Sequence, residues 1–207
     1  MKKKICILNY GVGNFFSIYK PLKEICNNTL VSNIKADLKK SDCIVLPGVG
    51  SFLSAINFMK KIEIFDIIQD HNIRGKQIVG ICLGMQILMS HGNEDGYTSG
   101  LNMIEGESIR IPLKKNYKIP NVGLREIQTV YKKEFKNFSK FHGKKFYHLH
   151  SYKIKTKEKF IYAWSHAGDY KYNIPAIIKK DNITGLQFHP EISGKDGFSM
   201  FKSLLKN

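Results

Sequence analysis

The sequence has few arginines, although it is strongly basic. It contains 33 lysines and arginines against 17 acidic residues, which gives a formal net charge of +16. Only Arg74, Arg110 and Arg125 are arginines, so the other 30 basic residues are lysines. Recognition of phosphates and bases relies on the arginine fork, and no nucleic-acid-binding motif is present. The composition therefore favours a solvated, lysine-rich surface over a nucleic-acid function, and an acidic partner or substrate also fits.

The sequence also lacks a long apolar run and a paired-cysteine motif. No run approaches the length of a membrane-spanning helix, and the apolar segment after the N-terminal lysines is too short for a signal peptide. The four cysteines, Cys6, Cys26, Cys43 and Cys82, show no C-x-x-C spacing. This spacing argues against a zinc site and a disulfide framework. We expect a cytoplasmic protein with free thiols and no metal, cofactor or membrane segment.

Predicted strands and helices alternate in the N-terminal half. Apolar runs predict strands at residues 5–10, 30–34, 42–46 and 77–81, and amphipathic patterns predict helices at 15–27, 52–60 and 64–74. The G-x-G at residues 11–13 lacks the third glycine of a dinucleotide-binding fingerprint. We expect residues 35–41 to be a polar link. Such alternation is typical of a parallel sheet that is covered by helices on both faces.

The C-terminal half has a different pattern. Residues 91–100 are predicted to be a polar loop. Short alternating runs follow, which we interpret as antiparallel strands with little helix between them, and then a last apolar strand and a closing helix; the ranges are 108–111, 122–131, 145–155, 160–166, 183–188 and 197–205. The whole chain, 1–207, is therefore predicted to be one α/β domain with a mostly parallel central sheet, flanking helices and added antiparallel strands.

Cys82 lies between the predicted strand 77–81 and a predicted helix at 84–90. Gly80 and Gly84 flank it in a G-x-C-x-G frame, the cysteine form of the nucleophile elbow, in which a tight turn presents the central side chain. The N–H groups and the dipole at the start of a helix favour a thiolate and a developing oxyanion. The pattern predicts a reactive cysteine; a buried, inert cysteine is the alternative.

His189 directly follows the last predicted strand and begins the sequence H-P-E. Residues two apart in an extended backbone face the same way, so Glu191 can orient the ring of His189 while Pro190 stiffens the link. A thiol nucleophile needs such a base and orienting partner. We therefore predict that Cys82, His189 and Glu191 act together.

His148 and His150 alternate along a predicted strand. Two histidines without a third ligand are weak evidence for a metal. We expect one of them to face the core and the other to face the surface or the rim of a pocket.

Three motifs in this order resemble the class I, triad-type glutamine amidotransferases. They are GICLGMQ at residues 80–86, PGVGSF at 47–52 and QFHPE at 187–191. NYGVGNF at residues 9–15 and the single-valine PGVG are most similar to the glutaminase subunits of imidazole glycerol phosphate synthases, which belong to histidine biosynthesis. The resemblance runs nearly end to end.

The resemblance implies a role for each matching residue. Cys82 would attack L-glutamine and release ammonia, and His189, oriented by Glu191, would transfer the protons. Backbone N–H groups of Val49, Gly50 and Leu83 would hold the oxyanion. The amino-acid end of glutamine would be bound by Gln86, Glu94, Ser151 and Tyr152.

The resemblance also implies a partner. Ammonia would pass to a synthase subunit, expected to be a (β/α)₈ barrel, in a stable heterodimer that makes imidazole glycerol phosphate and AICAR. The family usually has Met-Gly-Trp-Asn at this interface, whereas residues 121–125 here read NVGLR, with Leu124 and Arg125 in place of the aromatic residue and the amide. This difference leaves open a paralogue that supplies ammonia to another synthase, such as one that amidinates a surface sugar.

Two further alternatives remain from the sequence. One is a cysteine hydrolase on a similar elbow fold, although the acid of such a triad normally precedes the histidine. The other is a basic binding module without enzymatic activity, for which Cys82, His189 and Glu191 would be a coincidence.

Overall fold

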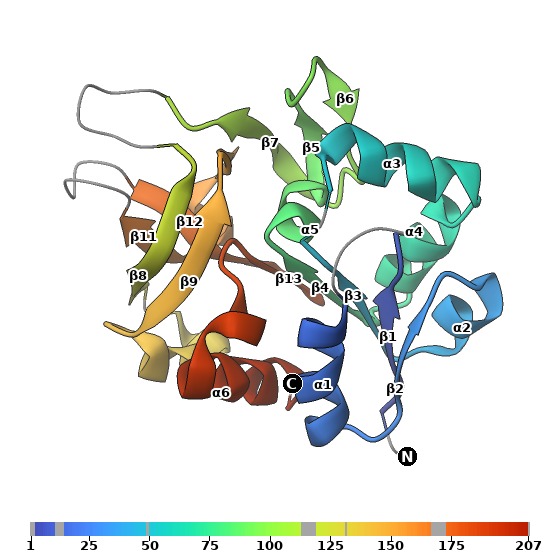
Figure 1. Cartoon of the computed structure of the whole chain (residues 1–207), viewed down its shortest axis with the longest axis horizontal. Coiled ribbons are helices and arrows are strands. Elements are labelled where there is room, and N and C mark those ends of the chain that lie inside the picture. Colours follow the sequence, from blue (N-terminus) through green and yellow to red (C-terminus); the bar gives the residue numbers. More distant parts are fainter. Residues whose placement is uncertain are drawn as a thin grey trace.

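The central element of the fold is a mixed sheet of nine strands (Figure 1). The computed structural model describes residues 3–10, 15–48, 50–112, 119–130, 132–166 and 173–206. Half of the sheet is parallel, in the order β2 (Thr29–Ser32), β1 (Ile5–Leu8), β3 (Cys43–Leu46), β4 (Gln77–Ile81) and β13 (Ile183–Leu186). The other half continues antiparallel through β12 (Asn173–Lys180), β11 (Ile161–His166), β8 (Asn121–Thr129) and β9 (Lys145–His150).

A second sheet of four strands lies beside the first. Its order is β10 (Tyr152–Thr156), β7 (Ile104–Arg110), β5 (Met89–Gly92) and β6 (Thr98–Ser99). Only Ser151 separates β9 of the large sheet from β10 of the small one. The two sheets therefore meet at this residue.

Helices cover both faces of the parallel half (Figure 1). The described α-helices are α1 (Phe16–Ile25), α2 (Lys35–Lys40), α3 (Phe52–Lys61), α4 (Phe65–Ile73), α5 (Leu83–Gln86) and α6 (Gly194–Leu205). Short 3₁₀ segments are η1 (Lys133–Phe141), η2 (Glu158–Phe160) and η3 (Pro190–Ile192). Within the described residues, none of the helices is both long and apolar enough to cross a bilayer.

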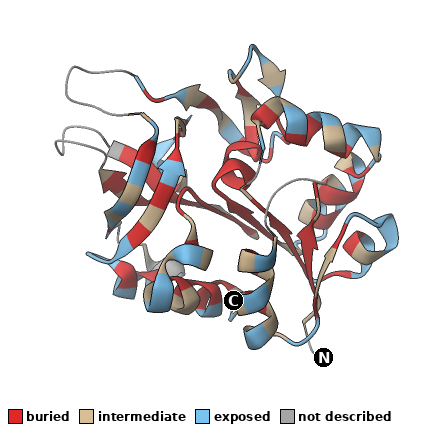
Figure 2. Cartoon of the chain, viewed as in Figure 1, coloured by how far each residue is buried: buried red, intermediate tan, exposed pale blue. Residues whose placement is uncertain are grey.

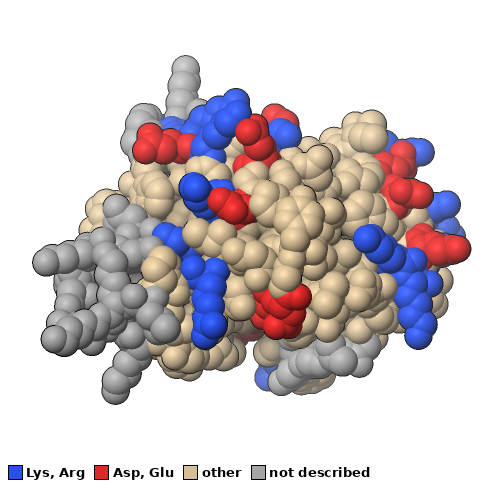
Figure 3. Space-filling model, turned by 90° about the horizontal axis from the view of Figure 1, so that it is seen from above, with Lys and Arg blue, Asp and Glu red and all other residues tan. Residues whose placement is uncertain are grey.

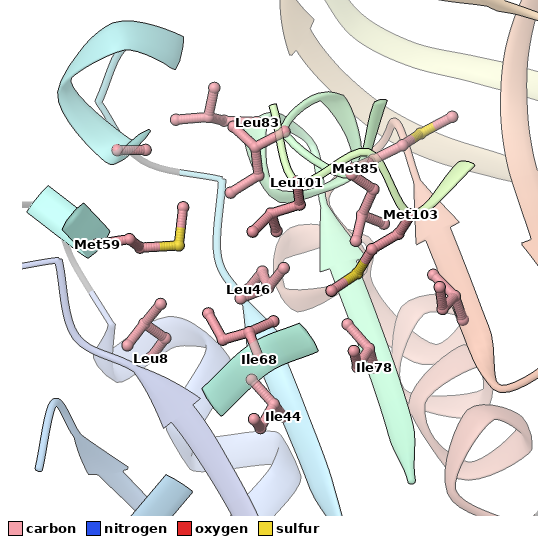
Figure 4. Close-up of a cluster of buried hydrophobic side chains, with 14 of the residues drawn as sticks. Leu8, Ile44, Leu46, Met59, Ile68, Ile78, Leu83, Met85, Leu101 and Met103 are labelled. Atoms are coloured by element: carbon pink, nitrogen blue, oxygen red, sulfur yellow. The ribbon is translucent and has the colours of Figure 1, made fainter. Parts of the chain in front are cut away.

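The core consists of two layers, one on each face of the large sheet. One layer includes buried side chains of α2, α3 and α4, and the other includes those of α1 and α6. Figure 2 shows the buried residues concentrated along the parallel strands and the helix faces that pack on them. In Figure 4, Leu83 and Met85 of α5 lie in the first layer with Leu46, Ile78 and Met103. The helix after Cys82 is therefore anchored in the core.

The parallel strands and long helices of the N-terminal half confirm the sequence prediction, but α2 was missed. Residues 35–41, predicted as a polar link, contain α2. Leu38 is the only fully buried residue of this helix, and Asp37 accepts a hydrogen bond from Ser32 Oγ at 2.8 Å. A single apolar residue creates no periodicity, so the sequence pattern could not show a helix here.

The predicted helix at 84–90 and the predicted loop at 91–100 were also wrong. α5 ends at Gln86, and residues 89–92 form β5, which pairs with β6 and β7. Leu88 and Met89 are fully buried. A short apolar run that is buried throughout has no period to separate helix from strand, so long-range pairing decided.

Three differences concern the C-terminal half. The single run predicted at 145–155 is two strands in different sheets, β9 and β10. The strand β12 and the nine-residue segment η1 were not predicted. The G-x-G turn at residues 11–13 and Val49 lie outside the described residues.

Charged side chains on the face shown in Figure 3 do not gather by sign. Lysines and arginines lie beside aspartates and glutamates, and a broad area between them carries no charged side chain. In the described chain, ion pairs join Lys35 to Glu63 at 2.6 Å and Lys157 to Glu105 at 2.7 Å. The described residues on this face therefore show no basic stripe of the kind that a nucleic-acid site needs.

Candidate active site

The turn that carries Cys82 is sterically strained and tightly packed. Cys82 has φ 50° and ψ −106°, a left-handed conformation that side chains rarely adopt. A Cβ atom on Gly84 would lie 1.9 Å from the carbonyl oxygen of Leu46, and one on Gly80 would lie 2.5 Å from that of Gly84. The two glycines are therefore required by the close approach of β3, β4 and α5, as the G-x-C-x-G frame predicted.

α5 is shorter than the sequence suggested, which changes the electrostatic argument. With four residues, Leu83–Gln86, it offers little of the macrodipole expected of a longer helix. Leu83 is its first residue, a position whose N–H has no intrahelical acceptor. The oxyanion prediction therefore depends on single backbone N–H groups rather than on a helix dipole.

His189 and Glu191 form a buried pair. Nδ1 of His189 lies 2.7 Å from Oε1 of Glu191, and the two side chains are 11% and 6% exposed. The backbone differs from the predicted extended segment, because Pro190–Ile192 is the 3₁₀ turn η3. The turn, and not strand alternation, brings the carboxylate to the ring.

The environment of His189 keeps its ring protonated. Burial acts to lower the pKa of His189, but hydrogen bonds with Cys82 and Glu191 and the negative charges of both groups outweigh it and raise the pKa to about 10. At neutral pH the imidazole is therefore a cation that can donate a proton.

Gly48 shows how closely Cys82 and His189 approach. A Cβ atom on Gly48 would lie 2.6 Å from Cβ of Cys82 and 3.3 Å from Cε1 of His189. The two side chains thus border the same small space, which only a glycine leaves open. Cys82 comes from the end of β4 and His189 from beyond β13, and these strands are parallel neighbours in the sheet.

A pocket of about 270 Å³ opens at Cys82. Its lining includes every predicted oxyanion and substrate residue that the structure describes: Gly50, Leu83, Gln86, Glu94, Ser151 and Tyr152. Gly50 adopts φ 85°. The remaining lining residues are Gly48, Pro120, Leu149 and His150. Its volume suits a small polar molecule rather than a polymer.

Hydrogen bonds hold the walls of this pocket. Gln86 Nε2 donates to the carbonyl oxygen of Tyr152 at 3.2 Å and to Gln187 Oε1 at 3.4 Å. Glu94 Oε2 accepts from the backbone N–H of Phe52 at 2.8 Å. Burial and, next, the charge of Glu94 raise the pKa of the Tyr152 phenol. One acidic side chain therefore faces the pocket, where it can meet an ammonium group.

His148 lies in the core and His150 lines the pocket, as predicted, although the rings of both residues are buried. They are 0% and 6% exposed, and His148 Nδ1 lies 3.1 Å from His150 Nε2. Residues two apart on a strand share a face. Burial lowers the pKa of His150 to about 4 and that of His148 well below its usual range, so both rings are neutral at pH 7. In the described part of the chain, no group of three or more metal-ligating side chains is found.

Sequence reasoning missed several residues of the site. Gln187 is fully buried, and its Nε2 lies 3.8 Å from Cys82 Sγ. Cys82 Sγ also lies 3.7 Å from the carbonyl oxygen of Leu149. Gln187 stood in the QFHPE motif and could have been considered; Leu149 and Pro120 carry no sequence signal, because their place depends on how β8 and β9 pair.

Comparison with known proteins places the chain in a family. The model of the family "Glutamine amidotransferase class-I" matches residues 9–206. A protein of Lactococcus lactis named imidazole glycerol phosphate synthase subunit HisH is 35% identical over 204 residues, covering 99% of this chain and 98% of that protein. A protein of the same name from Caldanaerobacter subterraneus is 37% identical, with 96% of each chain covered.

Solved structures share the fold. A structure described as a glutamine amidotransferase superposes with a TM-score of 0.75 at 15% identity, covering 98% of this chain and 97% of that one. A chain from the structure of PurLQS from Thermotoga maritima gives a TM-score of 0.71 at 21% identity, with 100% and 99% covered. With the family model and the HisH relatives, these findings identify the chain as an enzyme of the class I glutamine amidotransferase family.

Proposed function

We propose that this chain is the glutaminase subunit of an imidazole glycerol phosphate synthase. The observation that carries the proposal is that Cys82, which lines the pocket of about 270 Å³, lies beside the His189–Glu191 pair across Gly48. The HisH relatives, which match along nearly their whole length, support this subunit assignment. Residues 1–207 would then act as one amidotransferase domain in the cytoplasm.

The first half of the reaction forms a thioester. Cys82, as the thiolate, attacks the carboxamide carbon of L-glutamine, and the negative charge moves to the carbonyl oxygen. The backbone N–H groups of Leu83 and Gly50, together with Val49, are the proposed donors to this oxyanion. As the C–N bond breaks, the protonated ring of His189 gives its proton to the amine, and ammonia leaves. The product on the enzyme is a γ-glutamyl thioester.

The second half hydrolyses that thioester. His189 is now neutral and takes a proton from a water molecule as the water attacks the thioester carbon. The C–S bond then breaks, glutamate leaves and Cys82 returns to the thiolate. Glu191 holds the ring through Nδ1 in both halves, so that the other ring nitrogen faces the reacting atoms.

The charged end of glutamine fits the polar wall of the pocket. The carboxylate of Glu94 would attract the α-ammonium group, and Gln86 with the backbone at Ser151 and Tyr152 would hold the remaining polar atoms. Such a pocket selects an amino acid with a free α-amino group over a peptide.

Ammonia needs a partner subunit to be useful. In water at neutral pH it is mostly protonated and no longer a nucleophile, so it must pass directly to a second site. Val122, Leu124 and Leu149 are 42%, 56% and 48% exposed, and Leu149 also lines the pocket. Val122 and Leu149 are direct partners across β8 and β9. We propose that this apolar face docks a synthase subunit, a (β/α)₈ barrel, which uses the ammonia to make imidazole glycerol phosphate and AICAR.

The identity of the acceptor has one alternative. Leu124 and Arg125 stand where the family usually has an aromatic residue and an amide, and Leu124 is 56% exposed on the proposed docking face. This difference favours a second candidate, a paralogue that supplies ammonia to another synthase. Both candidates use the same glutaminase chemistry.

The Cys82→Ala variant tests the function. In the complex with the histidine-pathway synthase, we expect the variant to lose glutamine-dependent product formation by at least about 10³-fold. Synthesis from added ammonium salt should stay intact, since the acceptor site is on the partner. Cys43→Ala, which removes a buried thiol from β3, is the matched control. Retained glutamine use by the Cys82→Ala variant would overturn the nucleophile.

The Leu124→Asp variant tests the docking face. A charge in the middle of an apolar contact should weaken binding to the synthase by roughly tenfold or more. Ile73→Asp, at a side chain 82% exposed at the end of α4, should leave the affinity unchanged. Titration of the purified subunits gives both values. If the unaltered chain does not bind the histidine-pathway synthase, the second candidate, a paralogue with another acceptor, is favoured. Equal losses of affinity in Leu124→Asp and Ile73→Asp would argue against the proposed docking face.

A further inference from the structure

A chain of hydrogen bonds leads from Arg125 on β8 into the pocket. Arg125 Nε donates to Asn121 Oδ1 at 3.1 Å. Asn121 Nδ2 lies 3.2 Å from His150 Nε2, and His150 Nδ1 lies 2.8 Å from the carbonyl oxygen of Tyr152. Asn121 and His150 are 2% and 6% exposed. These hydrogen bonds therefore connect strand β8 at the surface with the wall of the pocket through buried groups.

The direction of each hydrogen bond follows from the chemistry of its ends. A guanidinium can only donate, so the amide oxygen of Asn121 must face Arg125 and its NH₂ must face His150. Nε2 of His150 is then an acceptor, and the proton of this neutral ring is on Nδ1. A carbonyl can only accept, so Nδ1–H donates to Tyr152. Both ends of the chain independently require the same tautomer.

His148 agrees with this assignment. Its Nδ1 lies 3.1 Å from Nε2 of His150. Two nitrogens without protons would repel each other at this distance, so Nδ1 of His148 carries the proton and shares the single lone pair of Nε2 with the NH₂ of Asn121. Its other nitrogen, Nε2, is then a bare acceptor, and it is buried without a hydrogen-bond partner. His148 packs against the ring of Phe188 instead, with centroids 5.8 Å apart. The tautomers of both histidines are thus determined by their contacts.

The chain continues from Tyr152 to the nucleophile. The Tyr152 carbonyl oxygen also accepts from Gln86 Nε2, whose second hydrogen points to Gln187 Oε1. Gln187 Nε2 in turn lies 3.8 Å from Cys82 Sγ. Loss of the His150 donor would leave the Tyr152 carbonyl free to turn and would loosen Gln86, which lines the glutamine pocket.

We propose that His150 is a positioning residue of the glutamine pocket, held in its Nδ1–H tautomer by Arg125 through Asn121. It does not transfer a proton in the reaction. It orients the backbone at Tyr152, one of the groups that hold the amino-acid end of the substrate. The inference rests on the proposed function, because it names a residue that serves the same pocket.

Two variants of His150 show whether the pocket depends on the hydrogen bond that this residue donates or only on the size of its side chain. In His150→Asn, the amide NH₂ can occupy the place of Nδ1–H and still donate to Tyr152. In His150→Gln, the longer amide reaches toward the place of Nε2 and leaves the carbonyl without that donor. A purely structural role would not rank the shorter side chain above the longer one.

The measurement is inactivation of the purified chain by the chloromethyl ketone analogue of L-glutamine, with mass spectrometry to locate the adduct. We expect His150→Gln to raise the half-saturating concentration of the analogue roughly tenfold, the effect of about one lost buried hydrogen bond. His150→Asn should stay within about twofold of the unaltered chain. Iodoacetamide has no amino-acid end and does not need the contacts at Tyr152, so the rate at which it alkylates Cys82 should not change in either variant.

A variant of Arg125, where the series of hydrogen bonds begins, extends the test without changing a buried histidine. Arg125→Met should raise the half-saturating concentration about threefold, because Asn121 can then rotate. Gln128→Met, at an exposed position on the same strand, should have no effect. Nitrogen-15 NMR of the histidine rings should show Nδ1–H for His150 in the unaltered chain.

The outcomes distinguish the two levels of the proposal. No analogue adduct at Cys82 in the unaltered chain would overturn the proposed function. An adduct with equal half-saturating concentrations in His150→Asn and His150→Gln would overturn the role of His150 alone. An Nε2–H tautomer of His150 in the NMR spectrum would also contradict that role. So would a rate of alkylation by iodoacetamide that changes together with the half-saturating concentration of the analogue.

Discussion

The two halves of the large sheet contribute different parts of the site. The parallel half carries the chemistry, since Cys82 follows β4 and His189 follows β13. The antiparallel half carries part of the surroundings: Leu149 and His150 of β9 line the pocket, and β8 presents the exposed apolar face. Ser151 and Tyr152 continue this wall into the small sheet. The reactive groups lie where the strands are buried on both faces, and the proposed docking face lies where one face of the sheet remains open.

Burial explains the difference between the halves. Every residue of β1, β3 and β13 is buried, because helices cover both faces of these strands. β8 and β9 alternate between buried and exposed residues. A strand with one open face can change its outward residues without disturbing the core, which is how Leu124 and Arg125 can differ from the usual family residues while the triad geometry remains.

The largest expected effect in the parallel half is the loss of the Glu191 charge. Glu191→Gln keeps an acceptor for Nδ1 of His189 but removes the charge, so kcat for glutamine hydrolysis in the complex should fall about 10³-fold. Because the protonated ring of His189 donates its proton to the leaving amine, activity of the unaltered enzyme should persist as pH rises and decline only through about pH 10. In the variant, burial lowers the pKa of His189 with less opposition, so this decline should move to lower pH.

A pH profile of kcat checks this prediction. Glu126→Gln, at an exposed carboxylate on β8, is the control and should keep both rate and profile. An unchanged alkaline limb in Glu191→Gln would show that the carboxylate does not hold the proton on His189.

The next largest effect is on stability, and it compares Gly84 of α5 with Gly185 of β13. In Gly84→Ala, the new methyl group would lie 1.9 Å from the backbone oxygen of Leu46, which cannot move without shifting β3, so we expect a loss of about 3 kcal/mol or more in the free energy of unfolding. In Gly185→Ala on β13, the nearest atoms, at 2.7 Å, belong to the side chains of Ile178 and Met85. These side chains can shift, and the loss should be about 1 kcal/mol.

Urea denaturation of both variants measures the difference. Equal losses in the free energy of unfolding would mean that the backbone around Gly84 can adjust as easily as the side chains around Gly185. If Gly84→Ala does not fold, its recovery in the insoluble fraction beside soluble Gly185→Ala gives the same ranking.

The sequence predicted the parallel half well, because its signals are local. Buried strands read as short β-branched runs, and G-x-C-x-G is a requirement of one turn. The pairing of His189 with Glu191 followed from a separation of two residues, although the actual backbone is a 3₁₀ turn. The resemblance to the amidotransferases then supplied the pocket residues, all of which, apart from the undescribed Val49, line one pocket.

The antiparallel half was predicted less well, because its elements depend on distant partners. The division of 145–155 into two strands at Ser151 follows from two different sheets, which no local pattern encodes. Gln187 stands in the QFHPE motif and His150 near His148, but neither pattern indicates their roles, which depend on contacts with Cys82 and Asn121.

The sequence by itself determined which groups are reactive, because a strained turn and a short histidine–carboxylate spacing are written in consecutive residues. Only the tertiary structure decided the tautomer of His150, the raised pKa of His189 and the position of the exposed apolar face. Each of these depends on burial and on charges or donors from strands far apart in the chain, and such terms exist only once the sheet has assembled.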